Sequence, residues 1–520
     1  MSASKDISSC KKCNHMIVNT FKFCQYCGNE NVGLKVAAQS RTSTSFGDFE
    51  YNIITVITTF IHSRYEPLKK INHDNYSKEQ YNADNDAICV LFSLNHHYRS
   101  YKSMFFYFNL NQEYSLKYYK NENNFSLKMH INDPLKQLAL DLSYCDIEDA
   151  SILENVHCLK LRGNPKITNI DALGCVHKLW LNDCAGITNV DALGHVHKLV
   201  LEGCTGIRNV DALGSVYELY LNDCTGITNV DALGHVHKLV LEGCTGITNV
   251  DALGCVHKLY LNNCTGITNV DALGQVHFLS MEGCTGIRNV DALGSVYELW
   301  LDRCTGITSI DALGQVHDLW LNDCTGITNV DALGQVHFLS LEGCTGVTNV
   351  DALGGVHELY LDRCTGITNV DALGQVHKLF LTDCTGVTNV DALGGVHELY
   401  LDRCTGITNV DALGQVHILS LDGCTGLVGI RNLPNVYELD ISNCINIEEV
   451  INLSSVTVLK AINCSKLKVI RNLPVLKSLD ASNCIILQEV SGILDDANLD
   501  LHKCKKLKEV KGIKKTIRLP

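Results

Sequence analysis

The chain lacks any long hydrophobic run. A membrane-spanning helix needs roughly 18 or more consecutive apolar residues, and the longest apolar run near the N-terminus, Ile53 to Ile61, is interrupted by threonines. The first residues, MSASKDISSCKKC, contain no hydrophobic stretch of the kind that a secretory signal needs. We therefore expect an intracellular, cytoplasmic protein that does not cross a membrane.

The chain also lacks an excess of positive charge. Its 43 Lys and Arg against 57 Asp and Glu give a formal net charge of −14, whereas binding to nucleic acid or anionic lipid needs clustered Lys and Arg. No Ser/His/Asp set, phosphate-binding glycine loop or carboxylate pair lies outside the repeat described next. The sequence therefore predicts a protein that is not an enzyme and whose partner presents a basic protein surface.

A period of 20 residues dominates the sequence. Seventeen cysteines follow at this spacing from Cys184 to Cys504, Asn164 takes the same position one turn earlier, and Cys145 precedes it by 19 residues. This makes about 19 turns. A column of 18 thiols at one repeat position is not a set of disulfide pairs. We expect a reducing compartment and inert, buried thiols, because no base faces the column.

Each turn reads VHxLxLxxCxxIxxVxxLGx. The two leucines spaced two apart indicate a short strand, because side chains two apart on a strand share a face. In one turn the residues expected to point inward are Val196, Leu199, Leu201, Cys204, Ile207, Val210 and Leu213. The turns should stack into a solenoid in which each buries a ring of apolar side chains against its neighbours.

This LxLxxN/C pattern, with its Ile-Thr-Asn and Val-Asp-Ala-Leu segment, resembles the leucine-rich repeat, in a shortened form similar to the internalin-like and cysteine-containing classes. Residues 136–520 carry it. The resemblance implies an α/β-type solenoid of mostly short parallel strands with loops or 3-10 turns, which binds a protein partner on its concave strand face. The wording LGxVHxLxLxxCxxITxV is also similar to repeat proteins of giant viruses, several of which carry an F-box; such an origin implies the host cytoplasm.

One outward column of the strand face is rich in aromatic residues. The residue between the two strand leucines should point away from the core, and this column holds all three tryptophans of the chain. The predicted partner-binding residues are Trp180, Tyr220, Tyr260, Trp300, Trp320, Tyr360, Phe380 and Tyr400. Exposed aromatic residues concentrate at interface hot spots. The alternative is that the rings only stack and stabilise the sheet.

Two further columns are interpreted as structural. Histidines recur from His157 to His417, with tyrosine at three positions of this column. Metal binding or pH sensing is the alternative for this column, but metal ligands do not tolerate exchange for tyrosine in this way. The aspartate of each Val-Asp-Ala-Leu-Gly segment, such as Asp171, is predicted to cap a one-turn helix.

The N-terminal residues 1–31 carry two CxxC pairs separated by ten residues. Cys10, Cys13, Cys24 and Cys27 have the spacing of a four-thiolate site and predict a structural zinc ion. The segment resembles a zinc ribbon. A disulfide pairing, or His15 as a ligand, is the alternative. Residues 32–45, rich in small residues, Ser and Thr, are predicted to be a linker.

Residues 46–135 precede the repeats and have a mixed helical and aromatic character. The stretch from Ala87 to Tyr101 resembles the second half of an F-box, although the usual opening Leu-Pro pair is missing and a polar insert from His62 to Asp84 divides the region. The resemblance implies a substrate receptor that joins a ubiquitin ligase through a Skp-type adaptor. The alternative is a mostly helical cap that shields the first solenoid turn.

Overall fold

A computed structural model describes residues 7–9, 16–18, 107–122, 137–431, 433–510 and 517–518. The chain divides into two compact units, Met1–Asp84 and Asn85–Pro520. In the first unit, β1 (Ile7–Ser9) pairs antiparallel with β2 (Met16–Val18). The second unit contains the solenoid. No helix among the described residues is long and apolar enough to cross a membrane.

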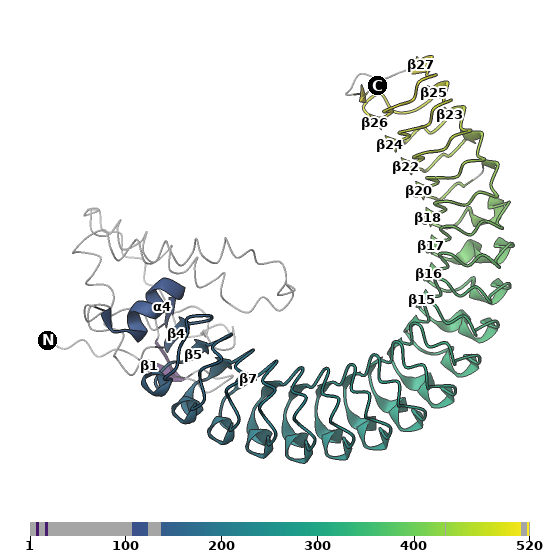
Figure 1. Cartoon of the computed structure of the whole chain (residues 1–520). Helices are drawn as coiled ribbons and strands as arrows, with labels where there is room; N and C mark the ends of the chain where they lie inside the picture. Colours follow the sequence, from purple (N-terminus) through teal and green to yellow (C-terminus); the bar gives the residue numbers. More distant parts are fainter. Residues whose placement is uncertain are drawn as a thin grey trace, which may run out of the picture. The chain divides into compact units, whose positions relative to one another are not determined.

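The solenoid has one short strand per turn, and the strands form a continuous parallel sheet. From β5 to β26, neighbouring strands pair at an offset of 20 residues, so that Leu259 faces Leu279, because these turns have the same length. Within the solenoid the strands line one side of the stack and the 3-10 helices line the other (Figure 1). The strands are β3 (Tyr107–Leu110), β4 (Gln137–Asp141), β5 (Cys158–Lys160), β6 (Lys178–Trp180), β7 (Lys198–Val200), β8 (Glu218–Tyr220), β9 (Lys238–Val240), β10 (Lys258–Tyr260), β11 (Phe278–Ser280), β12 (Glu298–Trp300), β13 (Asp318–Trp320), β14 (Phe338–Ser340), β15 (Glu358–Tyr360), β16 (Lys378–Phe380), β17 (Glu398–Tyr400), β18 (Ile418–Ser420), β20 (Glu438–Asp440), β22 (Val458–Lys460), β24 (Ser478–Asp480), β26 (Asn498–Asp500) and β28 (Ile517–Arg518).

A short helix precedes the first regular turn. α4 (Gln112–Tyr119) is capped at its N-terminus by Asn111, whose side chain accepts a hydrogen bond from the Tyr114 amide. The Tyr119 hydroxyl donates to the Asp149 carbonyl at 2.9 Å, which ties the helix to the solenoid. Most of the predicted F-box-like or capping region 46–135 lies outside the described residues, so that prediction stays a prediction.

The aspartate that opens each 3-10 helix does not cap it, contrary to the sequence-based prediction. The side chain of the asparagine two residues earlier does this instead: Asn209 Oδ1 accepts from the Asp211 amide at 2.8 Å. This is an Asx turn, and it recurs in successive turns. The 3-10 helices are η4 (Ser151–Leu153), η5 (Asp171–Cys175), η6 (Asp191–Leu193), η7 (Asp211–Ser215), η8 (Asp231–His235), η9 (Asp251–Cys255), η10 (Asp271–Gln275), η11 (Asp291–Ser295), η12 (Asp311–Gln315), η13 (Asp331–Leu333), η14 (Asp351–Gly355), η15 (Asp371–Leu373), η16 (Asp391–Gly395) and η17 (Asp411–Leu413).

The last turns replace the 3-10 helices with a second parallel sheet. Here the Asp-Ala-Leu-Gly segment is absent from the sequence, and the chain continues in extended form. This five-stranded sheet consists of β19 (Gly429–Ile430), β21 (Glu449–Ile451), β23 (Val469–Arg471), β25 (Glu489–Ser491) and β27 (Glu509–Val510). The core continues underneath, with Ala461 buried where earlier turns have a strand leucine.

The interior of the solenoid is a stack of apolar rings. The seven inward residues predicted for the turn from Val196 to Leu213 are all at most 1% exposed. The glycine after each leucine allows adjacent turns to approach closely: a Cβ at Gly214 would lie 2.3 Å from the Ala232 carbonyl oxygen. The prediction of a repeat solenoid with a thiol-containing core is confirmed.

Candidate functional site

The eight predicted partner-binding residues all lie at the carboxyl ends of strands in one sheet. They end β6, β8, β10, β12, β13, β15, β16 and β17. Each side chain is half-buried rather than freely exposed as predicted. Where aromatic residues occupy adjacent turns, the strand spacing brings their rings into contact, so each ring covers part of its neighbour.

Six of these rings belong to an unbroken row of eight. The row runs through Tyr260, Phe278, Trp300, Trp320, Phe338, Tyr360, Phe380 and Tyr400, and successive ring centroids are 4.2–5.6 Å apart. We call these eight side chains the aromatic row. At this spacing every ring touches the next, which is the range for favourable aromatic contacts.

Phe278 and Phe338 were missed by sequence reasoning. Both turns have serine in the aromatic column, and the ring stands two residues earlier on the same strand face. Ser280 is fully buried, and its hydroxyl donates to Asn262 Oδ1 at 2.6 Å. The available signal was the paired exchange itself, because β11 and β14 both read Phe-Leu-Ser, whereas most other strands from β6 to β17 have a charged residue, leucine and an aromatic residue.

Trp180 and Tyr220 lie outside the aromatic row. Val200 and Val240 occupy the intervening turns and are buried. Lysine continues the contact instead: the Lys238 ammonium lies 5.1 Å from the Tyr220 ring centroid and 5.2 Å from that of Tyr260. These are cation–π distances. The surface is therefore aromatic in its centre and cationic-aromatic toward the first turns.

A column of acidic and amide side chains borders the aromatic row. Burial raises the pKa of Asp302 to about 6, and it raises the pKa of Glu242, Asp362 and Asp402. The carboxylates are held in place by the next turn; Asp302 Oδ1 accepts from the Asn322 amide at 2.8 Å. This border gives the surface a negative edge.

On the other side of the row, some of the charged residues form ion pairs with residues of the adjacent strand. Lys198 Nζ lies 2.8 Å from Glu218 Oε2, and Lys378 Nζ lies 3.1 Å from Glu398 Oε2. Such pairs neutralise one another locally and contribute little to stability when partly exposed. Two carboxylates of the acidic border are also paired: Arg303 Nη2 lies 3.2 Å from Glu282 Oε2, and Arg363 Nη2 lies 3.4 Å from Glu342 Oε2.

The histidine column forms a second stack. Its rings, including Tyr217 and Tyr297, are stacked at centroid distances of 4.2–4.9 Å from His157 to His417. Burial, and then the charges of His157 and His197, lower the pKa of His177 to about 4. Tyrosine fits the same stack as histidine, in agreement with the structural interpretation.

The cysteine column lies inside the core. Cys204 donates its thiol hydrogen to the Leu181 carbonyl at 3.1 Å, and the same contact repeats along the solenoid. Burial raises the pKa of Cys204 to about 12, so the thiol is inert at neutral pH. Cys145 was wrongly counted in this column: it is partly exposed and donates to the Ser143 carbonyl instead.

The predicted zinc ligands Cys10, Cys13, Cys24 and Cys27 lie outside the described residues. The structural zinc ion therefore stays a prediction, carried by the spacing of the four cysteines. The described residues of the solenoid hold a smaller group of metal-ligating side chains, His317, Asp318 and His337.

No known protein-family profile matches the chain, and no curated protein matches it. Among solved structures it is similar to an internalin (InlF) from Listeria monocytogenes, with 13% identity and a TM-score of 0.34 over 66% of this chain and 89% of that one. The functional domain of InlJ from the same organism, which includes a cysteine ladder, has 14% identity and a TM-score of 0.30 over 66% and 73%. A leucine-rich-repeat protein of Leptospira interrogans has 14% identity and a TM-score of 0.35 over 72% and 98%.

These neighbours are leucine-rich-repeat proteins. Independently of them, the described turns of the second unit show a 20-residue repeat with one short parallel strand, a buried thiol at the bend and, as far as η17, a 3-10 helix opposite the strand. This repeat builds a solenoid similar to that of leucine-rich-repeat proteins.

Proposed function

We propose that the protein is a non-enzymatic scaffold that binds a protein partner on the strand face, with the aromatic row as the centre of the contact. The observation that supports this most is the continuity of the row across eight successive turns, restored by Phe278 and Phe338 where the column has serine. Stacking for stability alone does not require the row to shift column, since Val200 and Val240 are accommodated without a ring.

The charge around the row indicates what the partner presents. The acidic border places carboxylates such as Glu242 and Asp302 along one edge, and burial makes these charges costly when nothing compensates them. A partner with Lys or Arg beside an apolar patch would bury the rings and neutralise the border at once. We therefore assign the partner a basic rim around an apolar centre.

The test is a pair of variants that differ only in whether the row is broken. Trp300→Ser removes one ring, whereas Glu298→Phe/Trp300→Ser moves it two residues along the strand and reproduces the native pattern of β11 and β14. Both proteins and the wild type are used as bait in cell lysate, and the captured proteins are quantified by mass spectrometry. Loss of a central aromatic residue typically weakens binding by about 2 kcal/mol, or roughly 30-fold.

We expect Trp300→Ser to lose partners that Glu298→Phe/Trp300→Ser retains. The control is Tyr217→His/Tyr297→His, which changes two exposed rings of the histidine column to the residue found in most turns. Equal capture by the wild type and Trp300→Ser refutes the proposal. Unfolding of Trp300→Ser, with normal folding of the variant that moves the ring, would make the row structural.

A role as a ubiquitin-ligase substrate receptor is a separate hypothesis, carried only by the resemblance of residues 87–101 to an F-box. Capture with the full chain and with a chain lacking residues 1–135 tests it. Ligase components, including a Skp-type adaptor, should be present in the first capture and absent from the second, while the partners of the strand face remain in both.

A further inference from the structure

Asp318 breaks the pattern of its column. The position before the central strand leucine is lysine, glutamate, phenylalanine or isoleucine in the other turns from β6 to β18, and only β13 has aspartate there. Its Oδ1 lies 2.7 Å from His317 Nδ1 and 3.9 Å from His337 Nδ1. Within the described residues, these three side chains are the one group of His, Cys, Asp or Glu whose ligand atoms all lie within 4.8 Å of one another.

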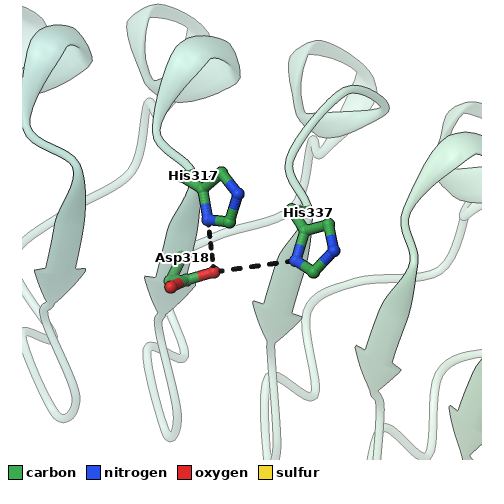
Figure 2. Close-up of side chains that lie close together, drawn as sticks. All are labelled: His317, Asp318 and His337. Atoms are coloured by element: carbon green, nitrogen blue, oxygen red, sulfur yellow. Dashed lines mark hydrogen bonds and ion pairs between the residues drawn. The ribbon is translucent and has the colours of Figure 1, made fainter.

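The length of the aspartate side chain explains why the contact forms here. Glu398 also follows a histidine, but its longer side chain extends to Lys378 in the adjacent turn, at 3.1 Å. The shorter Asp318 stays beside its own backbone, where the imidazoles of two successive turns are stacked with centroids 4.6 Å apart. Figure 2 shows both Nδ1 atoms facing the same carboxylate oxygen.

Two imidazole nitrogens and a carboxylate oxygen are the donor set of many divalent transition-metal sites. Around an ion with bonds of 2.0–2.2 Å, ligand atoms are separated by about 3.3–3.6 Å in tetrahedral geometry. The two observed separations, 2.7 and 3.9 Å, lie on either side of that range. His337 is 50% exposed, and its ring is stacked between His317 and His357, so closing the longer separation requires a shift of this ring within the stack.

The site is open to solvent and is bounded on one side of the stack. His317 is 40% exposed and Asp318 is 24% exposed, so an ion can reach all three ligands without rearrangement of the core. On one side the next ring is Tyr297, which has no imidazole nitrogen. Three protein ligands leave at least one coordination position for water or for a group of a bound partner.

We propose that His317, Asp318 and His337 form a surface site for one divalent transition-metal ion, with Zn²⁺ as the probe. The histidine column as a whole stays structural; the carboxylate converts one pair of its rings into a chelating group. The predicted four-cysteine site near the N-terminus is separate in the sequence and contributes equally to every variant used below.

The test is equilibrium dialysis of the full chain against micromolar Zn²⁺ at pH 7.5, with metal and protein quantified. Asp318→Lys introduces the residue found at Lys258 and Lys378 in the same column, and His337→Tyr introduces the residue of Tyr297 in the histidine column, so both fit the fold. The matched control is His377→Tyr, which changes the same column beside Lys378. Circular dichroism confirms that each variant is folded.

We expect Asp318→Lys and His337→Tyr each to bind one equivalent of Zn²⁺ less than the wild type, and His377→Tyr to bind as much as the wild type. Equal binding by all four proteins overturns the proposal and leaves a plain histidine–aspartate hydrogen bond. A loss in His377→Tyr as well overturns it in favour of unspecific binding along the column.

As a second readout, Co²⁺ replaces Zn²⁺, and the absorption of Asp318→Lys is subtracted from that of the wild type. Nitrogen and oxygen ligands give weak visible bands without the intense near-ultraviolet band of cobalt–thiolate bonds. A thiolate band in the difference spectrum would show that the lost ion had been bound by cysteine, which contradicts the assignment.

Discussion

Asn164 provides a quantitative test of how the solenoid satisfies its buried backbone. The first turn is one residue shorter at its bend than the next: four residues separate Leu142 from Ile147, whereas five separate Leu161 from Ile167. In a full turn the amide at the Ile position donates to the carbonyl of the cysteine three residues earlier, as Ile207 does to Cys204.

The short turn lacks that cysteine position, and the asparagine side chain replaces it. Asn164 Oδ1 accepts from the Ile147 amide at 2.9 Å, and its Nδ2 donates to the carbonyls of Leu142 and Leu161 at 2.9 and 2.8 Å. Asn164→Cys keeps one weak thiol donor and removes the acceptor. A buried amide left without a partner costs about 1–3 kcal/mol, so we expect a local loss of about 2 kcal/mol.

Hydrogen exchange followed by mass spectrometry measures this loss where it occurs, because a long solenoid does not unfold as one unit. Peptides that contain Ile147 should exchange roughly 30-fold faster in Asn164→Cys, which corresponds to about 2 kcal/mol. The reverse change, Cys204→Asn, places a larger amide in a fully buried position where the Ile187 amide already has a partner, and it should also destabilise its turn. Exchange within twofold of the wild type in either variant would refute the reasoning.

Three further predictions concern charge and thiol chemistry. Burial raises the pKa of Asp302 to about 6 and so destabilises its carboxylate. Asp302→Asn should therefore stabilise the protein by about 1–2 kcal/mol at pH 8, allowing for solvent screening at this half-buried site. In thermal melts this gain should disappear near pH 4; a gain that stays constant with pH would contradict the cause. The pKa of His177 is lowered to about 4 in the folded protein. On acidification the unfolded chain therefore takes up this proton first, and the stability of the folded protein falls between pH 6.5 and 4. Thermal melts of His177→Tyr should show a smaller fall over this range; the same pH dependence as in the wild type would contradict the prediction. Iodoacetamide at pH 8 should label the exposed Cys175 and Cys255 in the folded chain and spare the buried thiols. Peptide mapping measures the labelling of each cysteine. Rapid labelling of the buried column would mean that the solenoid opens.

Periodicity alone was enough to predict the solenoid, because each apolar position recurs every 20 residues and only one stacking of the turns buries all of them. It also predicted which strand positions point outward. It did not predict how far they are exposed, since exposure depends on the contact of each ring with the rings of adjacent turns. The half-burial of Trp300 and Trp320 is such a case, with their centroids 5.0 Å apart.

Exceptions to the repeat were harder to interpret than the repeat itself. Phe278 was not among the predicted residues, because a single sequence does not show that its ring reaches between Tyr260 and Trp300. The helix cap was assigned to Asp211 rather than Asn209, since both are good capping residues and only the backbone geometry separates them. The sequence did not distinguish Asp318 from the other acidic residues of the strand face; its proximity to the imidazoles of two successive turns is seen only in the structure.

A surface that repeats identically from turn to turn does not define a unique position for a bound partner along the solenoid. Any ligand that fits one group of rings would fit equally well one strand farther along, and binding would be spread over several staggered alignments. The irregular turns remove this degeneracy. The shifted rings of β11 and β14, and the aspartate of β13 between them, lie at unequal distances from the two ends of the aromatic row. A partner complementary to all three features therefore fits the row in one alignment.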